Sequence, residues 1–131
     1  MGASENKAAV EAGYAAFGQG DIASVIAMNA PDAVWHNYSS TASPLQGEHK
    51  GLDGIAALFG LIGDNIEFTQ FEIAPIAAEG DTVVAAGQQT YTVKRTGKTV
   101  SGPVVHVFTF GADGKVVRFE EWESNAEGAW T

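Results

Sequence analysis

Residues 99–123 read TVSGPVVHVFTFGADGKVVRFEEWE. The stretch is rich in Val, Phe and Thr, residue types that favour pleated, half-buried strands, and glycines begin and end the loop Gly111–Gly114. We therefore predict two long strands joined by this loop. The first strand carries His106 among valines and phenylalanines. A titratable side chain on an apolar strand indicates that this face of the sheet borders a pocket, although the substrate does not follow from it.

The preceding strand determines which way His106 points. A two-residue turn at Thr96-Gly97 would pair Arg95 with Lys98 and place Gly87 opposite His106. Directly paired residues share a sheet face, so the glycine would leave room for a ligand beside the histidine. The face predicted to line the cavity consists of Val83, Ala85, Gly87, Gln89, Tyr91, Val104, His106, Phe108 and Phe110.

The loop Gly111–Gly114 predicts the register of the second hairpin in the same way. Phe110 would pair with Lys115, and His106 with Phe119. The residues of the last strand expected on the cavity face are Val117, Phe119 and Glu121. The opposite face, expected to be left uncovered, carries Val84, Ala86, Gln88, Thr90, Val105, Val107, Thr109, Val116, Arg118, Glu120 and Trp122.

Composition indicates one globular domain over residues 1–131. The chain is 45% hydrophobic and 18% charged, which is typical of folded rather than disordered proteins. Its net charge of −9 argues against nucleic acid and anionic membranes as partners. The chain has no cysteine, which excludes disulfides and the usual zinc-finger spacings. The polar start MGASENK shows no secretory signal, so we expect a cytoplasmic protein.

Hydrophobic periodicity and turn residues predict three helices followed by a mainly antiparallel sheet. The expected helices cover 5–18, capped by Ser4, then 22–28, capped by Asp21, and 52–61. The expected strands are 33–38, 67–76, 82–95, 99–110 and 115–124, with a turn at 30–32 and a polar loop at 39–50. Helices first and an antiparallel sheet afterwards indicate the α+β class.

Several short motifs sharpen this prediction. They are Gly20-Asp21, AVWH at 33–36, GLDGI at 51–55, VHVF at 105–108 and FEEW at 119–122. Their order and spacing resemble the SnoaL-like, ketosteroid-isomerase-related branch of the nuclear-transport-factor-2-like (NTF2-like) superfamily, over almost the whole chain. The resemblance implies a cone-shaped, cystatin-like fold, in which a curved sheet wraps around three helices and encloses one apolar cavity. It also implies dimers formed through the back of the sheet.

At the site residues, the chain differs from the isomerase and is nearer to the cyclase branch. The tyrosine of the isomerase falls on Gly13, one residue from Tyr14, its base aspartate on Asn37, and its oxyanion aspartate on His106. Because all three positions are changed, steroid isomerisation by the family's mechanism is not expected. The cyclase branch places an acid on the final strand, where Glu121 is the nearest match.

His106, Glu121 and Asn37 are the catalytic candidates. A histidine titrates near physiological pH, and a carboxylate on a cavity face suits acid/base work. Alternative interpretations stay open: His106 as a core histidine satisfied by a neighbour, and Glu121 as a rim glutamate paired with Arg118 or Lys50.

Aromatic side chains are expected to wall the cavity and bind substrate, although each could equally be a core residue. They are Tyr14, Phe17, Trp35, Phe59, Tyr91, Phe108 and Phe119. His36 should face away from Trp35 and Asn37. We expect no metal site, because no His-x-His or His-x-x-x-His spacing occurs, and no cofactor, because no glycine-rich phosphate loop occurs.

These features predict a small-molecule enzyme of the isomerase, cyclase or hydratase kind, acting on an apolar oxygenated ligand by general acid/base chemistry. The alternatives are a non-catalytic binding module with the same cavity and a dimerisation domain whose cavity is filled by its own side chains. We also expect a homodimer, because no element remains to cover the back of the sheet around Val105 and Trp122.

Overall fold

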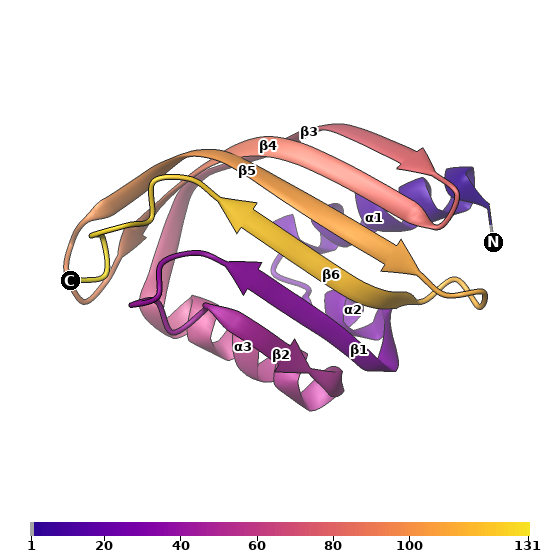
Figure 1. The fold of residues 1–131 in the computed structure, drawn as a ribbon, viewed down its shortest axis with the longest axis horizontal. Helices are drawn as coiled ribbons and strands as arrows, with labels where there is room; N and C mark the ends of the chain where they lie inside the picture. The colour runs from indigo at the N-terminus through magenta and orange to yellow at the C-terminus, as the bar shows by residue number, and fades with distance from the viewer. Residues whose placement is uncertain (1) are drawn as a thin grey trace.

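A computed structural model describes residues 2–131; Met1, which the predicted domain includes, lies outside the described residues. The described residues form three helices beneath one curved six-stranded sheet (Figure 1). The elements are α1 (Ala3–Gly18), α2 (Ile22–Ala27), β1 (Asn29–Tyr38), β2 (Gly47–Lys50), α3 (Gly51–Asn65), β3 (Ile66–Glu79), β4 (Thr82–Val93), β5 (Thr99–Phe110) and β6 (Val116–Glu123). The sheet order is β2-β1-β6-β5-β4-β3, and only the β1–β6 pairing is parallel. The α+β prediction, with an antiparallel sheet wrapped over three helices, is confirmed.

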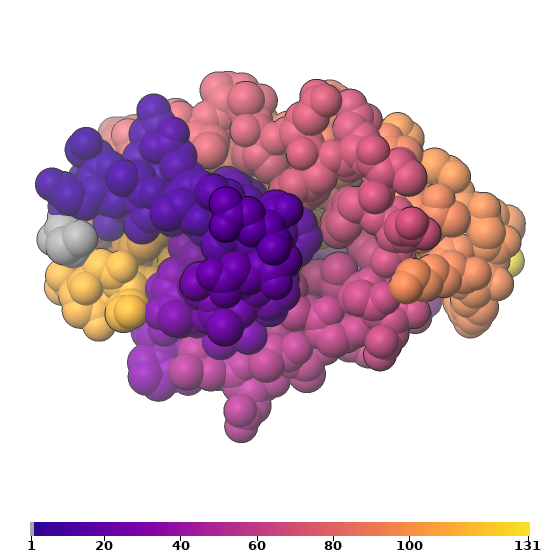
Figure 2. All heavy atoms as spheres, turned by 180° about the vertical axis from the view of Figure 1, so that it is seen from behind, coloured from indigo at the N-terminus to yellow at the C-terminus, as the bar shows by residue number. Residues whose placement is uncertain are grey.

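The helices lie on the concave side of the sheet, where Figure 2 shows α1 and α2 next to β3 and α3. α1 begins earlier than predicted: Gly2, not Ser4, is the N-cap residue, and its N–H donates to Glu5 Oε2 at 2.8 Å. Asp21 caps α2 as predicted, because its carboxylate accepts from the Ser24 N–H. No helix within residues 2–131 is both long and apolar enough to cross a membrane.

The first strand is longer than its sequence suggests. Residues 30–32, predicted as a turn, belong to β1. Pro31 is tolerated there because the pairing of β1 with β6 is irregular between Asn29 and Val34, so its missing N–H breaks no regular ladder bond. Part of the predicted loop 39–50 also forms a strand, β2, which pairs antiparallel with β1 and forms one edge of the sheet.

The β4–β5 hairpin is shifted by two residues from the predicted register. Ala85, rather than Gly87, lies opposite His106. The cause is the turn: the Val93 N–H donates to the Lys98 carbonyl, so the loop has four residues instead of two. An even shift changes every partner and leaves every side chain on its face. The predicted cavity face of both strands is therefore unchanged.

The β5–β6 hairpin is shifted by two residues as well, so that Glu121 lies opposite His106 and Phe119 opposite Phe108. A bulge after Thr109 changes the alternation at the start of β6. The predictions for Val116 and Val117 are therefore wrong: Val116 is fully buried, whereas Val117 is 37% exposed.

The C-terminal residues close one end of the molecule. Trp130 is 1% exposed, and its ring packs against that of Tyr91 at a centroid distance of 6.5 Å. The loop between β4 and β5 holds this tail, since Thr96 Oγ1 donates to the Ala129 carbonyl at 2.6 Å and the Arg95 guanidinium donates to the Trp130 carbonyl. Trp130, one residue from the end of the chain, is thus part of the core.

Candidate active site

A pocket lies between the three helices and the concave face of the sheet. Its volume is about 90 Å³, whereas a water molecule needs roughly 10–15 Å³ by a comparable measure, so it can admit a small organic molecule. The seven aromatic residues expected to bind substrate all line it: Tyr14, Phe17, Trp35, Phe59, Tyr91, Phe108 and Phe119. They contact one another closely, as in the Trp35–Phe119 pair with ring centroids 4.1 Å apart.

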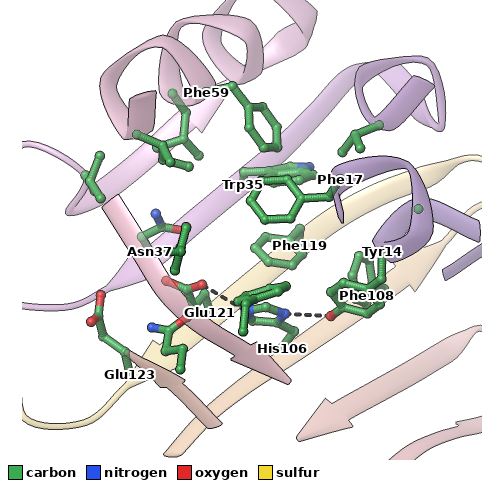
Figure 3. A pocket seen from close by; sticks show the side chains of 18 of the residues that line it. Tyr14, Phe17, Trp35, Asn37, Phe59, His106, Phe108, Phe119, Glu121 and Glu123 are labelled. Atoms are coloured by element: carbon green, nitrogen blue, oxygen red, sulfur yellow. Dashed lines mark hydrogen bonds and ion pairs between the residues drawn. The ribbon is translucent and has the colours of Figure 1, made fainter. Parts of the chain in front are cut away.

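Three polar side chains from separate elements form a continuous chain along one wall of this pocket (Figure 3). Tyr14 Oη, from α1, lies 2.6 Å from His106 Nδ1 on β5. His106 Nε2 lies 2.8 Å from Glu121 Oε2 on β6. His106 is 4% exposed, and the register that pairs it directly with Glu121 brings the two side chains together.

The partners in this chain fit one arrangement of hydrogens. Burial raises the pKa of the Tyr14 phenol, and the charge of Glu121 raises it further, so the phenol is protonated at neutral pH. Because a carboxylate only accepts, a ring hydrogen on His106 Nε2 would donate to Glu121, and Nδ1 would accept from the Tyr14 hydroxyl. Each ring nitrogen of His106 then has a partner, which fixes the orientation of the ring beside Glu121.

Glu121 keeps one oxygen for other partners. Its Oε2 accepts from His106, while its Oε1 has no hydrogen-bond partner among residues 2–131. The alternative partners expected for it are engaged elsewhere: Arg118 contacts Glu120 at 3.3 Å, and Lys50 contacts Glu48 at 3.7 Å. Glu121 is therefore not a rim glutamate held by a surface cation.

Asn37 lies beside this carboxylate, because β1 pairs with β6 in the register Asn37–Glu121. The side chain is 95% buried, lines the pocket and makes no hydrogen bond with another side chain or with backbone in the described part of the chain. His36, the next residue back along β1, faces the other side of the sheet, where its ring stacks on Tyr38 at 4.0 Å. His36 and Asn37 therefore lie on opposite faces of the sheet, as predicted.

A second polar pair lies further along the same wall. Tyr91 Oη donates to Glu123 Oε1 at 2.6 Å. Burial, and next the charge of Glu121, raise the pKa of Glu123 to about 7. Burial and the charge of Glu123 also raise the pKa of the Tyr91 phenol, which stays protonated. The sequence reasoning did not single out Glu123, although strict alternation after Glu121 puts it on the same face.

No three His, Asp or Glu side chains between residues 2 and 131 lie close enough together to hold a metal ion.

Comparison with known proteins agrees with this geometry. The model of the SnoaL-like domain matches residues 10–119, most of the chain. The chain belongs to the SnoaL-like family. The match contains Tyr14, Asn37 and His106, and ends two residues before Glu121. No protein in the curated collection matches the chain.

Solved structures similar to this SnoaL-like protein cover nearly its whole length. An NTF2-like protein from Burkholderia xenovorans LB400 is 28% identical, with 100% of this chain and 99% of that chain covered and a TM-score of 0.88. TerC, co-crystallised with polyporic acid, is 27% identical over 92% of each chain, with a TM-score of 0.76. A proposed polyketide cyclase from Xanthomonas campestris pv. campestris is 19% identical over 98% and 97% of the two chains, with a TM-score of 0.80, which supports the shared fold alone.

Proposed function

We propose that this SnoaL-like protein is a small-molecule enzyme of the isomerase, cyclase or hydratase kind, which acts on an apolar oxygenated ligand by general acid/base chemistry. One observation carries the proposal: a buried Tyr14–His106–Glu121 chain ends in a carboxylate oxygen that has no partner among the described residues, inside a pocket walled by aromatic rings. TerC, with a similar fold, was crystallised with the organic ligand polyporic acid, which is consistent with a small molecule of this type.

In this mechanism Glu121 is the base. Its Oε1 removes a proton from a carbon next to a ligand carbonyl, and the electrons of the broken C–H bond move into the carbonyl to give an enolate. Protonated Glu121 then returns the proton. In an isomerisation it goes to another carbon of the enolate, and in a cyclisation to the alkoxide formed when the enolate carbon attacks a second carbonyl. In a dehydration it goes to a neighbouring hydroxyl, which leaves as water while the carbonyl reforms. All three reactions share the first proton transfer, so the geometry supports the class without distinguishing its members.

The other polar residues support that step. His106 holds Glu121 through Oε2 and is a positioning residue, rather than the base that its sequence suggested. The Asn37 amide lies beside Glu121, makes no hydrogen bond within residues 2–131, and could donate to the oxygen on which negative charge develops. Aromatic walls exclude water and bind the apolar body of the ligand, which strengthens both interactions.

The function is tested with a panel of oxygenated aromatic and polyketide-like ketones. Binding is measured by thermal shift and calorimetry, and conversion by chromatography with mass detection. Conversion of a ligand that also binds supports the enzyme. A ligand that binds tightly and is recovered unchanged under all conditions supports the non-catalytic binding module instead.

Tyr14→Phe should lower kcat by about fivefold, because removing one hydrogen bond of about 1 kcal/mol leaves the His106 ring free to change tautomer. KM should change little, since the ring still lines the pocket. Steady-state kinetics of a ligand found in the panel measure both constants. An unchanged kcat would show that the Tyr14–His106 bond plays no part in turnover.

We also propose that the back of the sheet pairs two copies of this chain. Trp122 and Val105 lie opposite each other on neighbouring strands and are 40% and 36% exposed, and Val84 on β4 is 41% exposed. A second copy presenting the same patch would cover these side chains and close the assembly. Light scattering at micromolar concentration should give twice the 13.7 kDa of one chain, and Trp122→Glu should give a monomer. A wild-type monomer would refute the dimer.

A further inference from the structure

Gln89 is a buried polar side chain without a partner. It lies on the cavity face of β4, lines the pocket and is 3% exposed. Its Oε1 atom is inaccessible to solvent and accepts no hydrogen bond from residues 2–131. A buried acceptor of this kind is costly unless something donates to it. The proposed acid/base mechanism, which uses Glu121, His106 and Asn37, gives Gln89 no role.

Glu123 faces the same part of the pocket from β6. Tyr91 joins the two strands here, because it lies two residues after Gln89 on β4 and donates to Glu123 Oε1 at 2.6 Å. On the intervening strand β5, Gly102 lies opposite Gln89 and Val104 lies opposite Glu123, so the two polar side chains are offset by two positions along the strands. Ser39 lies close enough to the Glu123 carboxylate to lower its pKa by hydrogen bonding, although burial and the charge of Glu121 outweigh this effect. Gln89 Oε1 is thus the acceptor in this part of the wall that lacks a partner among the described residues.

These groups are separate from the proposed base. Glu121 and Glu123 are two residues apart on one strand, and their Cα atoms are therefore about 7 Å apart. Aromatic rings make up most of the remaining lining. The pocket thus has two polar sites on one apolar wall, one at Glu121 and one at Gln89 and Glu123, and roughly the width of an aromatic ring separates them.

We propose that Gln89 and Glu123 form a second polar subsite, which binds a hydroxyl group of the ligand remote from its reacting carbonyl. The ligand then carries this hydroxyl group in addition to its reacting carbonyl. The inference rests on the proposed function only in placing the reacting carbonyl at Glu121. The ligand hydroxyl donates to Gln89 Oε1, while its oxygen accepts from the carboxyl of Glu123. The raised pKa of Glu123, about 7, keeps a large share of that carboxyl protonated at neutral pH and able to donate.

The test compares two naphthoquinones that differ only by one hydroxyl on the ring remote from the quinone carbonyls. Their dissociation constants are measured by calorimetry for the wild type, Gln89→Leu and Gln88→Leu. Gln88 is the matched control, because it lies next to Gln89 on the opposite, exposed face of β4. In the wild type and Gln88→Leu, the hydroxyl should improve affinity about five- to tenfold, the worth of one good hydrogen bond. In Gln89→Leu this preference should fall to within twofold.

Binding needs no turnover, so the result stands even if no ligand is converted and the proposed function fails. Gln89→Leu should also melt at a higher temperature than the wild type without ligand, because it removes the unpaired acceptor. Should the leucine variant not fold, Gln89→Met, of similar length, takes its place. Two results would overturn the proposed subsite. One is a preference for the hydroxylated ligand that persists in the Gln89 variant. The other is a crystal structure of the complex in which a water molecule, rather than the ligand hydroxyl, donates to Gln89 Oε1.

Discussion

Replacing Glu121 by glutamine is expected to lower kcat by about 10²–10⁴-fold, the usual contribution of a general base. The amide has nearly the shape of the carboxylate and its oxygen can still accept from His106, so the pocket should keep its form. What it loses is the ability to take a proton. Ligand affinity should change by less than threefold, and the unfolding temperature by a few degrees at most. Steady-state kinetics, calorimetry and thermal unfolding of the same preparation measure these three quantities.

Glu120→Gln is the matched control for this experiment. Glu120 is the preceding residue of β6, faces the back of the sheet and contacts Arg118 at 3.3 Å. It removes the same charge from the same strand without touching the pocket, so its kcat should stay within twofold of the wild type. Equal losses in the two variants would indicate an effect of net charge on the fold and would rule out Glu121 as the base.

The second large effect concerns stability and pH. The pKa of Glu123 is 4.5 when freely solvated and about 7 in the folded protein, because it is buried and lies near Glu121. Between these values the folded state binds a proton that the unfolded state has released. The free energy of unfolding must therefore fall as the pH rises from 4.5 to 7, with a total loss from this group of at most about 3 kcal/mol.

Glu123→Gln should remove this dependence, since an amide does not titrate. Urea unfolding at pH 5 and pH 8 measures it for the wild type and the variant. The variant should be more stable than the wild type at pH 8, and the difference should shrink or reverse at pH 5, where the protonated glutamate donates or accepts as the amide does. Parallel stability curves for the two proteins across this range would contradict a buried, protonated Glu123 beside Tyr91 and Glu121.

The fold and the faces of the sheet could be predicted because they depend on periodicity. Strand residues alternate between faces, so His106, Phe119 and Glu121 lie on the concave side whichever even register the hairpins adopt. Both predicted registers were wrong by two residues, and both predicted faces survived. Val116 and Val117 show the limit of this reasoning, since one bulge exchanged their environments.

The contact that organises the site could not be predicted in the same way. The hydrogen bond between His106 and Glu121 depends on which residues lie opposite each other, and loop length determines that pairing. In the loop between β5 and β6, the Gly111 N–H donates to the Lys115 carbonyl, and a bulge follows Thr109. These backbone hydrogen bonds leave no pattern in the sequence, so the pairing could not be counted from it. Tyr14 reaches His106 across 92 positions of sequence, a distance that local patterns do not span.

The central claim is that Glu121 takes a proton from a carbon of the bound ligand, and solvent deuterium tests it most directly. A ligand that binds in the pocket is incubated in D2O with the wild type, Glu121→Gln or Glu120→Gln, and its mass is followed over time. We predict that the ligand gains deuterium at the carbon next to its carbonyl with the wild type and Glu120→Gln, and at no more than the uncatalysed rate with Glu121→Gln. A ligand that binds to the wild type and remains undeuterated, or that exchanges equally fast with Glu121→Gln, would contradict the account.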